Sequence, residues 1–526
     1  MREVTDISKS SASEGFKISS DTFYMISMIY LMIPVLIFTI GYLRPGAAIP
    51  VSVIFAGLTV VAVLDCGRGI AGEKLSCKTY IKIPYKYLIA FAVIALLISF
   101  ITGVGEFIFT LQDHPYRRAI LRDLIDYKWP VIYDYSTQTN PEVRQILGFD
   151  GGKVAFCYYF AYFLPAAVVG KLLGLGAANI FLLIWNALGM ALTLVGMTYF
   201  TKRASFAIPF VYVFFAGLDA LPDAFYAVTH YEAWLWLEGY VPCISYIANF
   251  TEYCNVFNQV VPCFLVMTLI LMQKNTRSMA LTAGVLFAYS PWAVIGMIPV
   301  AIARLLDKDT GCGRGKHIVK NVLSPVNILS VIALLTVFGS FYMANSGAVE
   351  YRGFTISFYE EPLWFIPCYL IFILVEIGAF VLILGKEHKK DPVFIAAVIT
   401  LLILPFYRIS EMNDLTMRGS MPALFVLQIY LAAKLTEIFE IRDIPKGRGI
   451  RLRLTGICLA VVLMMFPALE NMFVIFGSQL TGDVSNAENI GSFGNINQAE
   501  YAEVIKEQFY IDDYGKTFFF RYLAKD

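Results

Sequence analysis

Charged residues are scarce in this sequence. Asp, Glu, Lys and Arg together make up 15% of the 526 residues, whereas soluble domains carry about 25%. Apolar residues reach 58%, above the ~45–50% of soluble chains, a figure that also counts Gly. The 41 basic and 40 acidic residues nearly cancel, so charge does not predict binding to nucleic acid or to an acidic macromolecule.

Motifs of several other classes are also missing. There is no Gly-rich phosphate loop of the Walker type, so an ATP-driven pump is not indicated. No internal repeat or inverted symmetry of hydropathy is visible, which counts against secondary transporters built from repeats. Residues 1–22 mix acids and bases before a long apolar run, which is unlike a cleavable signal peptide. The nine cysteines are an odd number, so they cannot all pair within the chain. Only Cys243 and Cys254 share an expected outer loop, and unpaired thiols are favoured over a disulfide between them.

Long apolar runs are what the sequence does contain. Residues 23–43, 86–104, 323–343 and 363–385 are each almost free of charge away from their ends. About 20 helical residues at 1.5 Å rise span a hydrocarbon core of about 30 Å. The sequence therefore predicts an all-α, polytopic integral membrane bundle in the lipid bilayer, with about 13 spans and helices at the outer interface.

Basic residues gather in four short loops, which the positive-inside rule places in the cytoplasm. These loops contain Lys82 and Lys86, Arg304 to Lys320, Lys386 to Lys390, and Arg442 to Arg453. We expect a cytoplasmic N-terminal segment at 1–22, a transmembrane domain at 23–475 and an extracytoplasmic tail at 476–526. The outer loops of the domain are then 106–152, 218–255 and 408–420. The run between 277 and 304, broken at Ser290-Pro291, predicts a hairpin of two short helices.

The positive-inside rule does not determine how many times the stretch from 155 to 272 crosses the membrane. Residues 155–172, 178–200, 204–217 and 256–272 are all apolar, yet four crossings cannot connect an outer loop at 106–152 to an inner Lys274. Either one segment fails to cross, which we favour, or residues 226–247 add a crossing. The first option gives about 13 spans and the second about 15.

The first outer segment carries acids and arginines at head-group depth. Apolar residues recur at helical spacing from Tyr116 to Tyr127, which predicts an amphipathic helix on the membrane surface. Asp113 precedes this helix and is our candidate general base, because an acceptor hydroxyl for a lipid-linked sugar must be deprotonated there. The alternative is that Asp113 caps the helix, with Pro115 in its first turn. Glu106 is the second choice of base.

Two further outer segments supply candidate ligand-binding residues. The second contains His230, Glu232 and Trp234, which suit a hydroxyl-rich ligand; their spacing has no metal specificity, and a divalent cation is only an alternative. An interfacial aromatic belt explains the tryptophans equally well. The third is a charged turn from Arg408 to Pro422, which is either a salt-bridged turn of little energetic value or a phosphate site.

Three motifs together resemble the polytopic glycosyltransferases of the GT-C superfamily, in particular an uncharacterised bacterial branch. They are R-D-L…W-P at Arg122 to Pro130, H-x-E-x-W at His230 to Trp234, and N-D-x-x-M-R-x-S-x-P at Asn413 to Pro422. Many members have two adjacent acids in the first outer loop. Here Asp113 is followed by His114, which weakens any metal-assisted variant.

The resemblance implies transfer of a sugar from a polyprenyl-phosphate-type donor to an envelope glycan or lipid acceptor, with inversion, on the outer face of a cell membrane. Asp113 then acts as the base, with Glu106 behind it. The expected phosphate-binding residues are Arg408, Arg418, Arg117 and Arg118. The expected substrate-orienting residues are His114, His230, Glu232, Trp234, Asn413 and Asp414. A polytopic transporter or lipid flippase is the first alternative, and a non-catalytic scaffold the second.

Overall fold

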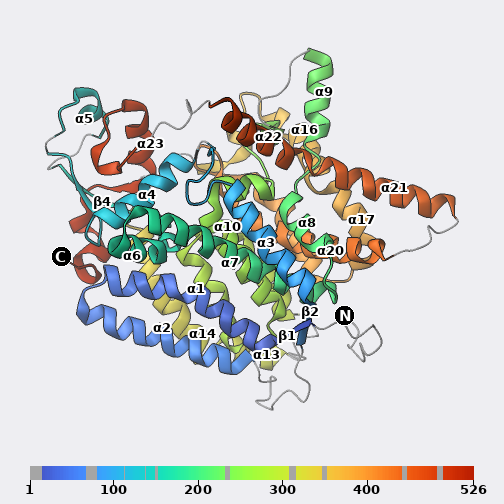
Figure 1. Cartoon of the computed structure of the whole chain (residues 1–526), viewed down its shortest axis with the longest axis horizontal. Coiled ribbons are helices and arrows are strands. Elements are labelled where there is room, and N and C mark those ends of the chain that lie inside the picture. Colours follow the sequence, from blue (N-terminus) through green and yellow to red (C-terminus); the bar gives the residue numbers. More distant parts are fainter. Residues whose placement is uncertain are drawn as a thin grey trace.

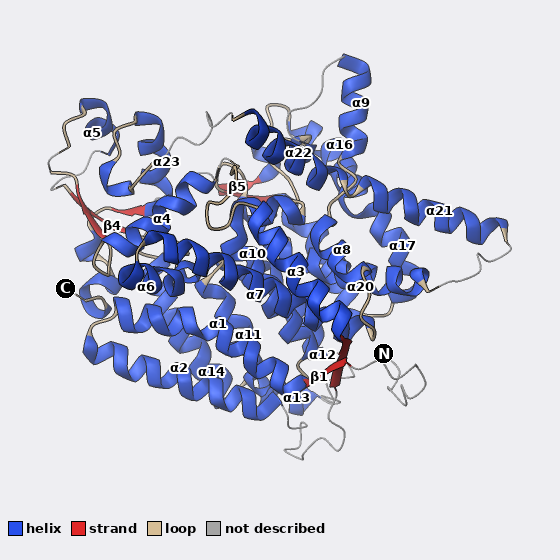
Figure 2. Cartoon of the chain, viewed as in Figure 1, coloured by secondary structure: helices blue, strands red, loops and turns tan. Residues whose placement is uncertain are grey.

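The fold is a bundle of apolar helices with a small mixed lobe at one end (Figures 1 and 2). In this computed structural model, the structure describes residues 15–66, 80–111, 113–136, 138–147, 152–230, 237–306, 315–345, 352–440, 447–482 and 490–525. Helices dominate the described residues, and strands are few and short. The prediction of an all-α membrane bundle is confirmed at this level.

Eight helices among the described residues are long and apolar enough to cross a membrane. They are Ser20–Tyr42, Pro45–Cys66, Leu175–Thr201, Asn249–Met272, Pro325–Tyr342, Pro362–His388, Asp414–Phe439 and Arg448–Thr481. Four shorter apolar helices are Tyr85–Ile101, Ala161–Leu173, Pro291–Leu306 and Pro392–Phe406. Many large apolar side chains on these helices are exposed, as expected where lipid covers the surface. The figure of about 13 crossings and the orientation of the termini stay predictions.

Local chemistry explains where several helices begin. Helix α1 (Ser20–Tyr42) is capped by Ser19, whose hydroxyl accepts a hydrogen bond from the Thr22 N–H at 3.1 Å. Asp391 caps α18 (Pro392–Ile403) in the same way, and proline occupies the first turn of α18, where no N–H partner is lost. The sequence signals for helix starts therefore operate here as they do in soluble proteins.

The core of the bundle is α10 (Asn249–Met272), whose residues are nearly all buried. It packs between α7 (Leu175–Thr201), α1 and α20 (Met421–Phe439). Close approach requires glycine on α7: a methyl group at Gly189 would collide with Tyr30 of α1 and Val261 of α10. Close packing on these sides holds α10 in place, and α10 carries residues of the candidate functional site.

The remaining helices complete the bundle. Their bounds are α2 Pro45–Cys66, α3 Tyr85–Ile101, α6 Leu164–Leu173, α8 Ala207–Phe214, α9 Ala220–His230, α11 Met279–Gly284, α12 Pro291–Leu306, α13 Gly315–Val322, α14 Pro325–Leu334, α15 Ser340–Tyr342, α16 Phe365–Ile373, α17 Ala379–His388, α19 Asp414–Gly419, α21 Arg448–Leu463 and α22 Phe466–Thr481. Two π-helical segments, Leu335–Gly339 and Leu374–Gly378, interrupt α14–α15 and α16–α17. Helix α9 projects away from the body of the bundle (Figure 1).

A small lobe joins the first outer segment to the C-terminal tail. It contains α4 (His114–Asp126), α5 (Pro141–Leu147), α23 (Ala499–Phe509) and a sheet of order β3-β4-β7. Strand β4 (Lys153–Phe156) pairs antiparallel with both β3 (Ile132–Asp134) and β7 (Tyr510–Ile511). Figure 1 shows this lobe at the opposite end from the β1 (Gly15–Ser19) and β2 (Tyr80–Pro84) pair. Within residues 490–525 the tail docks onto the lobe, through β7 and the Phe493 N–H.

The amphipathic helix predicted from the sequence does not lie alone on the surface, because the tail packs against it. The helix itself is confirmed as α4, but the tail covers part of its polar face. The carboxylate of Asp123 is fully buried and accepts hydrogen bonds from the Tyr133 hydroxyl at 2.7 Å and the Phe493 N–H at 3.0 Å. Helix α4 is therefore held between the bundle and the tail instead of lying bare on a membrane surface.

Two other expectations have clear outcomes. The run from 277 to 304 breaks at Ser290, and α11 and α12 lie on either side of the break, as predicted. Cys243 and Cys254 are both free thiols, so the disulfide alternative is wrong. Between residues 155 and 272, α6 has 10 residues and packs against α4; the number of crossings in this stretch stays a prediction.

Candidate functional site

Asp113 occupies the N-cap position of α4 without acting as a cap. Its side chain makes no capping hydrogen bond, and its backbone is already helical. The carboxylate is 41% exposed and lies 3.5 Å from Nη2 of Arg117. The helix start is supplied by Pro115 in the first turn. Of the two alternatives for Asp113, the cap is therefore wrong, and the carboxylate is available for other contacts.

Arg117 is a structural link from α4 to the bundle. Its Nε donates to the Asn255 carbonyl at 3.0 Å, and its Nη1 donates to the Tyr158 hydroxyl at 2.7 Å. The Asn255 carbonyl lies beside Val256, where α10 departs from helical geometry (φ −139°, ψ 41°). Because these two donors are used within the protein, Arg117 positions Asp113 against α10.

His114 is buried beneath the site. Its Nε2 lies 2.9 Å from the Thr102 carbonyl, which can only accept, so Nε2 carries the proton and donates. Burial lowers the pKa of His114 to about 4, so the ring is neutral at physiological pH. Its ring packs against Phe257. The structure therefore gives His114 a buried protein partner, where the sequence predicted contact with substrate.

Glu106 forms a second acid–arginine pair near the start of the lobe. Its carboxylate lies 3.1 Å from Nε of Arg118, and its backbone has a left-handed φ of 65°. Burial raises the pKa of Glu106, while Arg118 and Arg122 oppose that shift. Arg118 is thereby engaged by Glu106, the candidate second base.

The charged turn begins on strand β6 (Tyr407–Ile409), which pairs with β5 (Arg352–Phe354). Arg408 is mostly buried and donates to the Ser410 carbonyl at 3.1 Å, to the Glu411 carbonyl and to Sγ of Cys243. Its guanidinium also lies over the Phe358 ring. Arg408 therefore folds the turn onto its neighbours.

Asn413 has a similar role in the turn. It adopts a left-handed conformation (φ 58°) and caps α19 through its side-chain oxygen. Its amide nitrogen donates to the Cys243 carbonyl at 2.8 Å. The asparagine of the third motif thus sets the position of the next two charged residues, Asp414 and Arg418.

Arg418 and Glu252 form a buried ion pair between α19 and α10. Nη1 of Arg418 lies 2.8 Å from Oε2 of Glu252, and the two side chains are 9% and 2% exposed. Asp414, one turn before Arg418, lies 3.9 Å from its Nε. Among the described residues, nothing accepts a hydrogen bond from Nη2 of Arg418 and nothing donates to Oε1 of Glu252. The pair therefore keeps one donor group and one acceptor unmatched.

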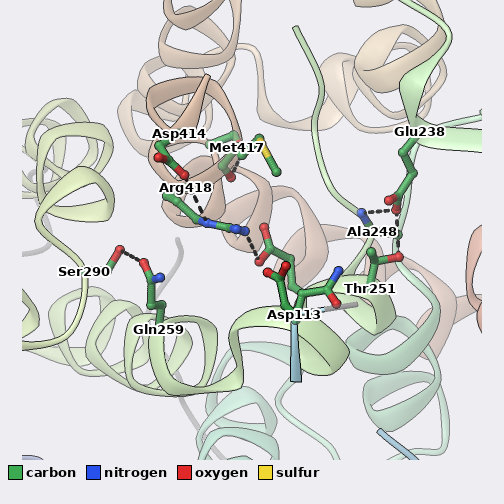
Figure 3. Close-up of polar contacts among 12 residues, drawn as sticks. Asp113, Glu238, Ala248, Thr251, Gln259, Ser290, Asp414, Met417 and Arg418 are labelled. Carbon is green, nitrogen blue, oxygen red and sulfur yellow. Dashed lines mark hydrogen bonds and ion pairs between the residues drawn. The ribbon is translucent and has the colours of Figure 1, made fainter. Parts of the chain in front are cut away.

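Asp113 completes this group. Figure 3 shows its side chain pointing toward the guanidinium end of Arg418, and its charge acts on both Arg418 and Glu252. The site thus draws on α4, α10 and α19, which are far apart in sequence. Three carboxylates and two guanidinium groups meet there, and we call Asp113, Arg117, Glu252, Asp414 and Arg418 the charged cluster.

Polar groups on α10 extend the site. Gln259 accepts a hydrogen bond from the Ser290 hydroxyl at 2.8 Å, at the break before α12 (Figure 3). The side-chain oxygen of buried Asn258 receives no hydrogen bond within the described part of the chain. Unmatched buried acceptors are rare in proteins and often mark the place of a ligand or water.

Two predicted residues of the second outer segment are not described, and the third lies elsewhere. Glu232 and Trp234 fall outside the described residues. His230 is exposed at the end of the projecting α9, where its ring stacks on Tyr226 at 4.2 Å. Among residues the structure describes, no group of three or more His, Cys, Asp or Glu side chains could hold a metal ion.

Glu252 was missed by the sequence analysis. The available signal was a single acid in an apolar stretch long enough to enter a membrane, which is a functional candidate by default. Chemically, the charged cluster offers a partly exposed carboxylate that can accept a proton, beside an arginine with an unused donor group. Comparisons with protein-family models, curated proteins and solved structures found no match to this chain.

Proposed function

We propose that the protein is a membrane glycosyltransferase that transfers a sugar from a polyprenyl-phosphate-type donor to a glycan or lipid acceptor. The observation that carries the proposal is the meeting of Asp113 and Arg418 in one charged cluster. A transferase of this kind needs a base for the incoming hydroxyl and a cation for the leaving phosphate. The two side chains supply these groups from separate elements.

Asp113 is the proposed base. It takes the proton of the acceptor hydroxyl as the oxygen attacks the anomeric carbon, and the bond from that carbon to the lipid phosphate breaks in the same step. Arg117 holds the carboxylate in place through their 3.5 Å contact.

Arg418 is the proposed phosphate-binding residue. Its Nη2 retains donors for a phosphate oxygen, whereas Arg408 uses its donors on two carbonyls of the charged turn and on Sγ of Cys243. The unmatched acceptors of Glu252 and Asn258 suit the hydroxyl groups of a sugar. The choice of Arg418 over Arg408 comes from their contacts, because the sequence did not distinguish these two arginines.

The test combines donor binding with transfer by purified protein in lipid nanodiscs. A photoreactive polyprenyl phosphate is expected to crosslink next to the charged cluster, and unlabelled polyprenyl phosphate is expected to compete. Arg418→Gln should weaken the crosslink. Crosslinking confined to other surfaces, with no competition, would contradict a lipid-phosphate site and with it the transferase proposal.

Transfer is then measured with a panel of polyprenyl-phosphate sugars. Asp113→Asn should lower the rate by about 10²-fold to 10⁴-fold, the usual contribution of a general base, without weakening the crosslink. Asp126→Asn is the matched control, because Asp126 lies exposed on the same helix. Full activity of Asp113→Asn would remove Asp113 from the mechanism.

A second candidate, a polytopic transporter or lipid flippase, is favoured by one observation. Glu376 is 2% exposed and lies in the middle of the candidate span Pro362–His388, where an ionisable residue is costly. In a transporter, the charged cluster would serve binding alone. Asp113→Asn and Asp126→Asn would then behave alike in every transfer assay, while flux across vesicles would depend on Glu376.

A further inference from the structure

Two carboxyl groups that are not part of the charged cluster meet inside the bundle. Asp219 follows α8 in the turn before α9, and Glu376 lies in the π-helical segment Leu374–Gly378. The two side chains are 0% and 2% exposed. The charge of Asp219 acts on Glu376, and the Glu376 carboxylate lies against Gly217, two residues before Asp219.

The backbone brings the two acids together. The Leu218 N–H donates to the Val375 carbonyl at 3.0 Å, which joins the turn to the π-helical segment one residue away from each acid. Gly217 has to lack a side chain, because a methyl group there would collide with the Glu376 carboxylate. π-Helical turns within α-helices often occur at functional sites. The meeting of the acids is therefore built into both elements.

No cation balances this pair within the described part of the chain. The groups that act on the two acids are other acids and tyrosines: Glu238, Glu470, Tyr240 and Tyr246, with Asp223 facing Glu470. The Tyr240 hydroxyl donates to Oε1 of Glu376 at 2.9 Å. Neither oxygen of Asp219 accepts a hydrogen bond from a described residue. The neighbouring Glu376 carboxyl can donate to Asp219 only if it carries a proton.

Two ionised carboxylates in this position would repel each other in a medium of low dielectric constant. Adjacent carboxyl groups that cannot both ionise share one proton and titrate as a coupled pair. A metal ion is not indicated, because a third ligand of the usual types is missing from the described residues. We propose that Asp219 and Glu376 form an exchangeable proton-binding site, which holds one proton between the turn after α8 and the span Pro362–His388.

The site has a structural consequence. With the proton bound, the pair joins the turn at 215–219 to the span; without it, like charge pushes them apart. The span carries π-helical geometry at this point, so the packing of α16 and α17 against the turn depends on protonation. This site does not rest on sugar transfer, and it would serve a transferase or a transporter equally.

The test uses the full chain in lipid nanodiscs and an apolar carbodiimide, which modifies protonated carboxyl groups in apolar surroundings. Peptide mass spectrometry locates the modified residue. We expect modification of Asp219 or Glu376 at neutral pH, decreasing as the pH is raised. Glu387 is an internal control on the same span, because it is paired with Lys434 at 2.8 Å and Arg453 at 3.2 Å and should stay unmodified.

Single variants test whether the two acids share the proton. In Asp219→Asn or Glu376→Gln, loss of the neighbouring charge should shift the pH midpoint of the remaining carboxyl by at least about one unit toward acid. Unchanged midpoints would overturn the coupling. No modification of either acid in the wild-type protein would overturn the proposal without any variant. Suppression by sodium at constant pH would identify a metal-cation site instead of a proton site.

Discussion

The charged cluster and the Asp219–Glu376 pair contain buried or half-buried acids in opposite electrostatic settings. In the cluster, Arg117 and Arg418 stand beside the carboxylates, and Asp113 remains 41% exposed. In the pair, the described neighbours are acids and tyrosines, and both side chains are almost inaccessible. In the first setting guanidinium groups offset the negative charge of the acids, and in the second no cation among the described neighbours does so.

This contrast separates two uses of a carboxyl group in a membrane protein. A base must be ionised and must reach a substrate, so it needs a cation and some exposure. A proton-binding site must hold a proton against bulk water, so it needs burial and like charge. Substitutions to the neutral amide should therefore have opposite effects at the two places.

The largest effect is expected at the Arg418–Glu252 pair. Glu252→Gln leaves the Arg418 charge buried without its main partner, which costs about 3–5 kcal/mol of unfolding free energy. Asp414, at 3.9 Å, recovers only part of this. Chemical denaturation in detergent micelles measures the loss.

A double variant, Glu252→Gln with Arg418→Met, is the matched control, because it removes both charges. It should recover much of the loss while transfer stays abolished. A loss from Glu252→Gln similar to that of an exposed acid would mean that the pair is hydrated, and it would remove the contrast between the two regions.

Asp123 tests an intermediate setting, in which a buried acid has hydrogen-bond donors but no cationic partner among the described residues. Burial raises the pKa of Asp123 to about 6, above the ordinary value of about 3.9 in an unfolded chain. The folded state therefore binds the proton more tightly. Stability should fall as the pH rises from about 4 to about 6, by about 2–3 kcal/mol in total.

Thermal unfolding across this pH range measures the effect. In Asp123→Asn this part of the pH dependence should disappear, while Asp126→Asn on the same helix should keep it. An unchanged profile in Asp123→Asn would assign the pH dependence to other groups. Loss of stability on acidification through the same range would contradict the raised pKa.

A smaller effect of opposite sign is expected at the proton site. In Glu376→Gln the side-chain amide can donate to Asp219, and Tyr240 can still donate to its carbonyl oxygen. Stability at neutral pH should equal or slightly exceed that of the wild-type protein, because neutral replacement of a poorly balanced buried charge is often favourable. Denaturation beside Glu252→Gln gives the comparison, and a loss of similar size in both would contradict it.

The sequence predicted the bundle because apolar length is a local property. The runs at 23–43 and 363–385 match Ser20–Tyr42 and Pro362–His388 closely, and the break at Ser290-Pro291 follows from proline chemistry. Asp113 and Arg418 were also found locally, as charges at the ends of apolar runs. Which arginine is engaged elsewhere was not predictable, because Arg408 and Arg418 differ only in their tertiary contacts.

The same dependence on tertiary contacts explains which functional residues the sequence analysis missed. The partners of Glu252 and Asp219 are known only once α10 and the turn after α8 meet α19 and the span Pro362–His388. Burial of Asp123 likewise depends on the tail, in which Phe493, 370 residues along the chain, donates a hydrogen bond from its N–H to the Asp123 carboxylate. Sequence patterns locate ionisable residues in apolar surroundings, but the partner that decides their charge comes from the fold.

Substitution of His230 is expected to have the smallest effect on transfer. It compares the role that the H-x-E-x-W motif implies with the position of the side chain in the structure. The resemblance makes it a substrate-orienting residue, but its ring is exposed on α9 and rests on Tyr226. Its Nδ1 is within 2.8 Å of the Thr229 hydroxyl, its neighbour in the chain. His230→Ala should leave transfer and polyprenyl-phosphate crosslinking within about twofold of wild type, as for an ordinary surface substitution. A much larger loss of transfer with unchanged stability would mean that α9 moves onto the charged cluster during the reaction, since the exposed ring has no other route to the substrate.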